Sequence, residues 1–257
     1  MKDTYHVIGY PVKHSLSPKI QMTLAKEYNQ EIEFTAVEIK PEDLQSKIAE
    51  FRDNTTIKGL SVTVPYKENV FDLCDDADDT ARDVKAASNV IFTTDRKMIA
   101  LNYDGLGIVN DIKNNHNVVL ADKDILIVGA GGAAKAVVTA IIKENPKSIT
   151  ITNRTLDKAV VIKNMFKYKF DIQIESFDNI VKSYDVIINS TSSSIYDELL
   201  PLCKNNFNDN AFAYDLMYKE GGTIFTKWCD SINIEWSDGK GMLQELSLAV
   251  FKYWRGL

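Results

Sequence analysis

The chain has 257 residues, of which 45% are hydrophobic and 26% charged, and its net charge is −6. It is long enough for one large domain or two of ordinary size. Its acidic, interspersed charges argue against a nucleic-acid partner or a membrane-surface role. It has no 18-residue apolar stretch and no signal-peptide core, so we expect no membrane helix. Its three cysteines, Cys74, Cys203 and Cys229, fit neither a disulfide framework nor a zinc site, so we expect structural thiols, no metal and a cytoplasmic protein.

The first hundred residues alternate between strand and helix patterns. Strands are expected at 4–9, 33–39, 58–64, 88–93 and 97–102, and helices at 17–28, at 42–52, after Pro65 and over 75–85. Ser17 is expected to cap the first helix, with Pro18 in its first turn. This order predicts a first α/β unit.

A helical pattern over 105–114 leads into a second α/β region. Its strands are expected from 125 and at 148–152, 171–175, 184–188 and 211–215, with helices between them and a last helix over 241–254. The fold class predicted is therefore α/β, with two α/β domains and a cleft between them. One domain would comprise 1–104 plus 238–257, and the other would comprise 105–237.

The most informative segment runs from 125 to 134 and reads Ile-Leu-Ile-Val-Gly-Ala-Gly-Gly-Ala-Ala. Gly129 allows a tight turn after the strand, Gly131 lets the backbone approach a pyrophosphate, and Ala134 packs helix on strand. The start of the following helix offers free N–H groups to phosphates. This pattern is typical of a dinucleotide-binding βαβ unit. The alternative is a glycine-rich turn in a domain that binds no nucleotide.

The end of the next strand predicts which dinucleotide is bound. An NAD site usually has a carboxylate there, but this chain has Asn153, Arg154 and Thr155, with Lys158 one turn later. A guanidinium in place of a carboxylate favours the 2′-phosphate of NADP(H). We therefore expect 105–237 to be a Rossmann-like NADP-binding domain, with 1–104 plus 238–257 as the substrate domain.

Hydride transfer to or from a carbonyl needs a proton partner. Candidates at strand ends are Lys67, Asp104 and Asn89, and His14 lies in a polar loop. Lys67 and Asp104 in contact would form a proton-transferring pair, although spacing does not show that they meet and each alone is also typical of a solvated surface. Ser15 and Ser17, beside a helix start, could bind a carboxylate, which is compatible with plain capping.

Motifs from both halves of the chain occur in one order: 9–18 (Gly-Tyr-Pro-Val-Lys-His-Ser-Leu-Ser-Pro), 62–67 (Val-Thr-Val-Pro-Tyr-Lys), Asn89, 102–105 (Asn-Tyr-Asp-Gly), the glycine loop, 153–155, 189–192 (Asn-Ser-Thr-Ser), Tyr218 and 238–243 (Asp-Gly-Lys-Gly-Met-Leu). With this combination the chain resembles the shikimate dehydrogenase family over nearly its whole length. The resemblance implies NADPH-dependent, reversible reduction of 3-dehydroshikimate to shikimate, a step of aromatic amino acid biosynthesis. It implies a small-molecule partner and a monomer or homodimer.

The same resemblance assigns roles to residues. Lys67 would be the acid/base, paired with Asp104. Substrate would be bound by Ser15, Ser17 and Tyr218 at its carboxylate and by Asn89 and Asp104 at its hydroxyls, with Thr63 lining the pocket. The implied cofactor residues are Gly129, Gly131, Gly132, Ala133 and Ala134 at the pyrophosphate, Asn153, Arg154, Thr155 and Lys158 at the 2′-phosphate, and Ser190, Thr191, Met217, Gly239 and Met242 toward the nicotinamide.

Three departures from the family pattern leave the substrate open. Tyr103 replaces a usual Thr, and Leu246 replaces a usual Gln; Gln244 lies about 200° away around a helix and cannot simply substitute. The family also commonly carries another helix beyond the end of this sequence. A paralogous dehydrogenase acting on quinate or another cyclic hydroxy acid is one alternative. A non-catalytic NADP-binding regulator is another, against which the retained Lys67 and Asp104 argue.

Overall fold

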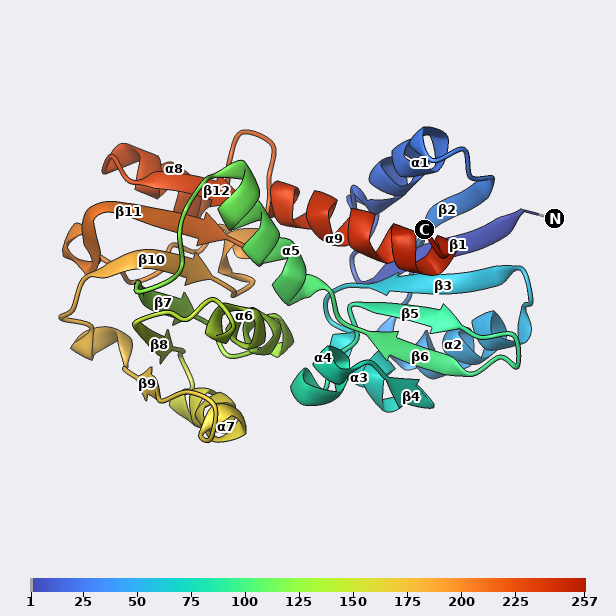
Figure 1. Ribbon diagram of the computed structural model, residues 1–257, viewed down its shortest axis with the longest axis horizontal. Coiled ribbons are helices and arrows are strands. Elements are labelled where there is room, and N and C mark those ends of the chain that lie inside the picture. The colour runs from blue at the N-terminus through green and yellow to red at the C-terminus, as the bar shows by residue number, and fades with distance from the viewer. Residues whose placement is uncertain (1) are drawn as a thin grey trace. The chain divides into compact units, whose positions relative to one another are not determined.

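The computed structural model describes residues 2–257. The chain divides into two compact units: one contains residues up to Asp104 together with Leu243–Leu257, and the other is Gly105–Met242. Each unit contains a six-stranded sheet with helices packed against it (Figure 1). The predicted two-domain α/β class is therefore confirmed.

The sheet of the first unit has the order β2-β1-β3-β5-β6-β4. Its strands are β1 (Asp3–Gly9), β2 (Ile32–Glu38), β3 (Ile57–Val62), β4 (Asp76–Ala77), β5 (Asn89–Phe92) and β6 (Met98–Leu101). β1 runs parallel to β2 and β3, whereas β5 is antiparallel to β3 and β6. The helices are α1 (Ser17–Glu27), α2 (Leu44–Asp53), α3 (Lys67–Asp72), α4 (Asp79–Val84) and the greater part of α9 (Gly239–Arg255).

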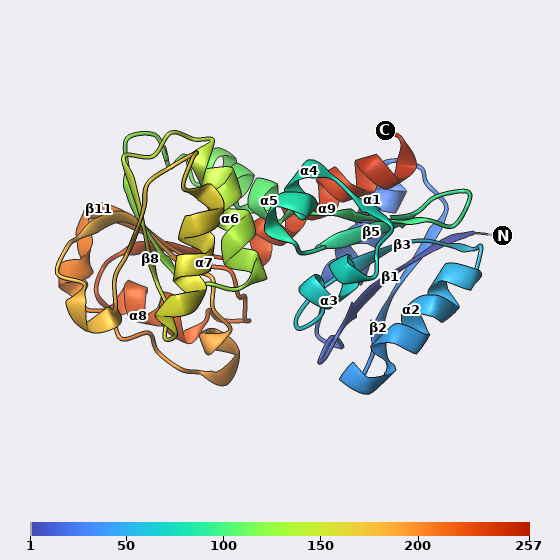
Figure 2. The same cartoon turned by 90° about the horizontal axis from the view of Figure 1, so that it is seen from below.

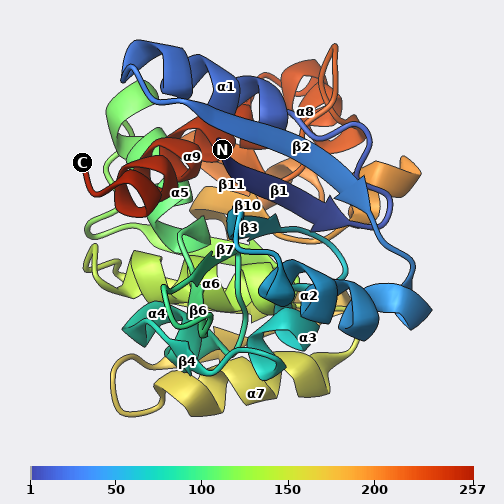
Figure 3. The same cartoon turned by 90° about the vertical axis from the view of Figure 1, so that its right-hand side faces the viewer.

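Successive residues of β1 face opposite sides of this sheet and build two cores. Tyr5 and Val7 pack with α1 and α9 through Ala25, Val250, Phe251 and Trp254. Ile8 faces the other core, where Leu60 and Val62 of β3 meet Leu44, Ile48, Phe51 and Val70 of α2 and α3. Figure 2 and Figure 3 show α1 with α9 on one side of the strands and α2 with α3 on the other.

The segment 75–85 is only partly helical, contrary to the sequence prediction. Asp76–Ala77 pairs with β6 as a short strand, so the helix starts at Asp79. Asp78 caps it by accepting a hydrogen bond from the Ala81 N–H. Pairing with a neighbouring strand outweighs helix propensity here, which a local pattern does not reveal.

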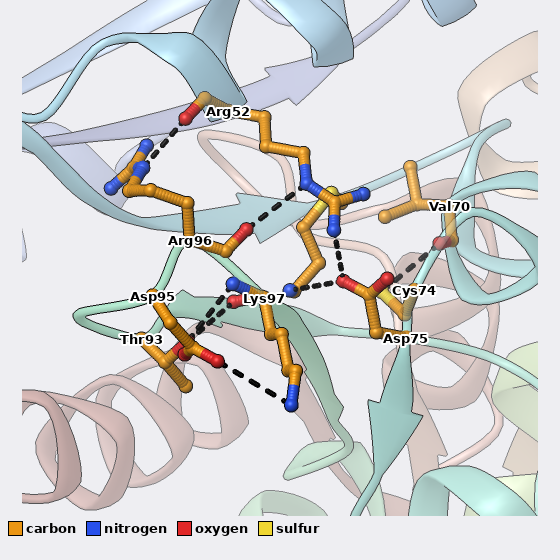
Figure 4. Close-up of polar contacts among 9 residues, drawn as sticks. Arg52, Val70, Cys74, Asp75, Thr93, Asp95, Arg96 and Lys97 are labelled. Carbon is orange, nitrogen blue, oxygen red and sulfur yellow. Dashed lines mark hydrogen bonds and ion pairs between the residues drawn. The ribbon is translucent and has the colours of Figure 1, made fainter.

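Arg96 anchors the β5–β6 hairpin to the end of α2. Its guanidinium donates hydrogen bonds to the backbone carbonyls of Phe51, Arg52, Asn54 and Ile57. These include terminal carbonyls that a helix leaves without partners. Arg52 returns a hydrogen bond to the Arg96 carbonyl and pairs with Asp75, so the hairpin, α2 and the chain before β4 are joined (Figure 4).

The second unit has the strand order β12-β11-β10-β7-β8-β9, and every pair is parallel. Its strands are β7 (Asp124–Val128), β8 (Ser148–Thr152), β9 (Ile172–Ile174), β10 (Tyr184–Asn189), β11 (Phe207–Asp215) and β12 (Glu235–Asp238). The helices are α5, α6 (Gly132–Ile142), α7 (Leu156–Phe166) and α8 (Ile224–Ser231); α5 spans Asp104–Asn110 and continues as a π-helix over Asp111–Asn115. The chain moves outward from β7 in both directions, which is the doubly wound order of nucleotide-binding domains.

Two parts of this unit differ from the sequence prediction. β12, with the sequence Glu-Trp-Ser-Asp, is short, has three polar residues out of four and was not predicted, because an edge strand of four residues has little periodicity. β11 begins at Phe207 rather than 211. No helix among the described residues has both the length and the apolar character needed to cross a membrane.

Candidate active site

In the first unit, one end of the sheet gathers most of the residues predicted to bind substrate. The Thr63 N–H donates to the Ile8 carbonyl, the Val62 N–H to Ser88 and the Ser88 N–H to Leu101. The segments that follow β1, β3 and β6 therefore lie beside the start of β5. Thr63 also lies against Gly9, where a Cβ would come 2.5 Å from the Thr63 methyl group.

Lys67 and Asp104 meet at this end of the sheet. The Lys67 Nζ lies 2.5 Å from the Asp104 Oδ2, and their side chains are 20% and 2% exposed. Lys67 is the first residue of α3 and Asp104 the first of α5, where a carboxylate is favoured by the helix dipole. The Asp104 N–H donates to Asn102 Oδ1. A buried carboxylate thus holds a partly exposed ammonium, which is a suitable arrangement for delivering a proton.

Asn89 is fully buried, and its neighbours fix the orientation of its amide. Ser88 Oγ accepts from the Tyr103 N–H, so its own hydroxyl donates to Asn89 Oδ1. Asn89 Nδ2 donates to Ser61 Oγ. One amide N–H is left for a ligand, so Asn89 would act as a donor. Ser61 and Ser88 were not predicted; the only signal for Ser61 is a polar residue inside the apolar strand β3.

Ser15 and Ser17 lie at the start of α1, but Ser17 does not cap it. The cap position is Leu16, and no side-chain cap is formed; Ser17 is the first helical residue and is buried. Ser15 Oγ accepts a hydrogen bond from the Ser17 N–H at 3.3 Å. The prediction of capping by Ser17 was wrong because the helix begins one residue earlier. His14 is exposed in the preceding loop.

The glycine loop of the second unit lies where the strand order reverses. β7 pairs with β8 on one side and β10 on the other, and ligands of such sheets bind at this point. Gly129 has φ +112°, and a Cβ there would lie 2.7 Å from Ser190 Oγ in the loop after β10. Only glycine is compatible with both the backbone conformation and this close approach.

Gly131 needs a different explanation. Its φ is −92°, which any residue can adopt, and no atom of residues 2–257 lies within 4 Å of a Cβ built on it. The described part of the chain therefore leaves room for a side chain at this position, whereas a ligand bound in this space would exclude one. Gly131 is also the cap position of α6, which has no side-chain cap and no acidic residue in its first turn, formed by Gly132, Ala133 and Ala134. The loop and helix start therefore fit a pyrophosphate.

The end of β8 brings cations to the same edge. The Gly129 N–H donates to the Thr152 carbonyl, directly before the basic segment. Arg154, Thr155 and Lys158 are exposed, and Asn153 Nδ2 donates to the Thr155 carbonyl. None of the acidic residues described in the chain forms an ion pair with Arg154 or Lys158 within 4 Å, so both cations can take a phosphate.

The residues predicted near the nicotinamide come from the ends of β10, β11 and β12. Ser190 Oγ donates to the Val128 carbonyl, and Thr191 Oγ1 donates to Asn189 Oδ1. The Gly239 N–H donates to the Met217 carbonyl at 3.2 Å. A Cβ on Gly239 would lie 2.1 Å from the Leu216 carbonyl oxygen, so this approach requires glycine. Met242 is buried in the first turns of α9, and Tyr218 is half-buried.

Comparison with known proteins agrees with both units. Residues 7–91 match a family model described as the shikimate dehydrogenase substrate binding domain, and residues 111–198 match one described as shikimate / quinate 5-dehydrogenase. A shikimate dehydrogenase (NADP(+)) of Coxiella burnetii is 36% identical over 99% of this chain and 94% of its own length. The chain belongs to the shikimate dehydrogenase family.

Solved structures of similar proteins extend the comparison. An Ael1 enzyme from Pseudomonas putida is 32% identical with a TM-score of 0.91, covering 100% of this chain and 94% of its own. Shikimate dehydrogenase from Aquifex aeolicus is also 32% identical, with a TM-score of 0.88, covering 100% of this chain and 93% of its own.

Within the shikimate dehydrogenase fold, the unusual Tyr103 packs against the last helix. Its ring lies 6.4 Å from that of Tyr253 and adjoins the cluster of Val250, Phe251 and Trp254. Burial raises the pKa of Tyr103 to about 12. The ring is thus directed to α9. Leu246 is half-buried on the same helix, and Gln244 is exposed.

Proposed function

We propose that this protein catalyses the reversible, NADPH-dependent reduction of 3-dehydroshikimate to shikimate. The observation that carries the proposal is the Lys67–Asp104 pair at one end of the first unit's sheet, in a chain of this family. When bound, NADPH supplies the hydride that reaches the carbonyl carbon. Lys67 Nζ would give its proton to the carbonyl oxygen, and would take it back in the reverse reaction. Asp104 would hold Nζ in place.

Binding of substrate would use the other residues at this end of the sheet. The start of α1 has no acid in its first turn and offers N–H groups with Ser15 and Ser17, which suits the substrate carboxylate; the resemblance adds Tyr218. The free N–H of Asn89 and the carboxylate of Asp104 suit ring hydroxyls, as donor and acceptor respectively. Thr63 would line the pocket.

NADP(H) would be held by the second unit. The space at Gly131 and the uncapped start of α6 suit the pyrophosphate, and Arg154 with Asn153, Thr155 and Lys158 suits the 2′-phosphate. The Coxiella burnetii relative carries NADP(+) in its name, which supports the same cofactor. We also propose a cytoplasmic location, because the three cysteines are free.

A second candidate is a dehydrogenase for quinate or another cyclic hydroxy acid. It is favoured by Tyr103 and Leu246, and the second family model names quinate beside shikimate. A non-catalytic regulator is disfavoured by the intact Lys67–Asp104 pair.

Steady-state kinetics with shikimate and quinate, each against NADP+ and NAD+, test the proposal. We expect shikimate with NADP+ to give the highest kcat/KM. A higher value for quinate would establish the second candidate instead, and absence of turnover with every pair would refute both.

A further inference from the structure

Asp215, at the end of β11, is a completely buried carboxylate in the second unit. Its described donors are all neutral: Ser194 Oγ and Thr223 Oγ1 at 2.6 Å, the Met217 N–H at 3.0 Å and Asn189 Nδ2 at 3.2 Å. A buried charge is expensive unless it is fully hydrogen-bonded. The Asp215 carboxylate accepts four hydrogen bonds, yet the proposed function gives Asp215 no role.

The four donors belong to two loops at the carboxyl end of the sheet. Asn189 and Ser194 flank the loop after β10, and Asn189 Oδ1 in turn accepts from both the N–H and the hydroxyl of Thr191. Met217 and Thr223 both lie in the loop after β11, and Thr223 also caps α8. A single carboxylate therefore joins the loop that carries Thr191 to the loop that carries Met217.

We propose that Asp215 is a positioning residue for hydride transfer: it sets the loops of Thr191 and Met217 along the nicotinamide half of NADP(H). This inference rests on the proposed function, because it takes these loops to face the nicotinamide. A carboxylate suits the task because each of its oxygens accepts two hydrogen bonds without donating one. The adenosine half, at Arg154 after β8, lies on the other side of β7 and does not depend on Asp215.

The test compares Asp215→Ala with Asp124→Ala. Asp124, at the amino end of β7, is also a largely buried carboxylate, held by Lys147, Lys182 and Ser148, so its loss destabilises the same sheet away from both loops. For each variant we would measure Tm, kcat with shikimate and NADP+, and affinity for NADP+ and for adenosine 2′,5′-bisphosphate, which represents the adenosine half.

We expect Asp215→Ala to lower kcat by about tenfold or more, because small displacements of positioning groups have effects of this size. Its affinity for adenosine 2′,5′-bisphosphate should stay within about twofold of wild type if only the nicotinamide half is affected. Asp124→Ala should lower Tm without this loss of kcat. Asp215→Asn keeps one accepting oxygen and should restore part of kcat. Equal losses of kcat in Asp215→Ala and Asp124→Ala at similar Tm, or a parallel loss of adenosine-fragment affinity, would overturn the proposal.

If Asp215→Ala does not fold, Ser194→Ala provides the test, since it removes one donor and leaves the α8 cap intact. It should lower kcat with fragment affinity unchanged, and an unchanged kcat would overturn the proposal. If wild type binds NADP+ but turns over no substrate, the proposed function fails. In that case the test is the affinity for NADP+ divided by the affinity for adenosine 2′,5′-bisphosphate. A lower ratio in Asp215→Ala than in wild type supports positioning, and an unchanged ratio refutes it.

Discussion

Replacing Lys67 by Met separates the stability of the Lys67–Asp104 pair from its chemistry. The substitution keeps a side chain of similar length and removes the ammonium, so Asp104, 2% exposed, loses its ion-pair partner. Breaking a buried pair costs about 3–5 kcal/mol. Because the Lys67 side chain is 20% exposed and water reaches its end of the pair, we expect the lower value, about 3 kcal/mol of unfolding free energy.

The same substitution removes the proposed proton donor. Loss of a general acid typically lowers the rate about 10²- to 10⁴-fold, and we expect kcat to fall within this range. Affinity for NADP+ should be unchanged, since the glycine loop and α6 belong to the other compact unit.

The double variant Lys67→Met/Asp104→Asn distinguishes the two effects. With both charges removed, no uncompensated carboxylate remains, so urea denaturation should show much of the lost stability recovered, while NADPH oxidation stays slow. Lys47→Met is the matched control: Lys47 pairs with Glu50 on the surface, and its loss should cost less than about 1 kcal/mol. A double variant no more stable than Lys67→Met, or a wild-type kcat in Lys67→Met, would refute the reasoning.

Three further results are expected. Arg154→Ala should weaken NADPH about 10- to 100-fold and NADH little, because it removes a charge-assisted contact to the 2′-phosphate; equal losses in the two dissociation constants would make Arg154 structural. A thiol reagent at pH 8 should modify Cys203, which is exposed, but not Cys74 or Cys229, because burial raises the pKa of both thiols to about 12; all three should react in urea. Hydrogen bonds from Arg52 and the Met98 N–H lower the pKa of Asp75 in the folded protein. The ionised Asp75 carboxylate therefore stabilises the fold above its unfolded-state pKa of about 3.9, and this stabilisation is lost as the pH falls through its folded-state pKa. The difference in unfolding free energy between wild type and Asp75→Asn, below about 1 kcal/mol for this partly exposed pair, should therefore shrink in acid, and a constant difference would contradict this assignment.

The parts of this protein that could be predicted are those with a local signature. The glycine loop, the strands around it and the basic end of β8 are each specified within a few residues, because turn geometry and periodicity act over that range. Ser17 shows the limit of such patterns: Pro18 correctly marked the start of α1, but the cap itself moved by one residue.

The contacts that organise the sites have no local signature. Lys67 and Asp104 are 37 residues apart, and their meeting follows from the order of strands in the sheet. Arg96 has backbone carbonyls as acceptors, so no partner residue type marks it. Asp215 accepts hydrogen bonds from Asn189, at the end of β10, and from Thr223, at the start of α8. These residues come close together only when the sheet is assembled.

Tyr103 and Leu246 look like separate departures from the family pattern, but α9 links them. Leu246, Val250 and Tyr253 are spaced at i, i+4 and i+7 and so share one face of the helix. Tyr103 packs against the Val250 cluster and the Tyr253 ring. Tyr103 therefore packs against the same helix on which Leu246 lies, so the two departures from the family pattern share one helix face. With the roles proposed above, substrate hydroxyls would then depend more heavily on Asn89 as a donor and on Asp104 as an acceptor.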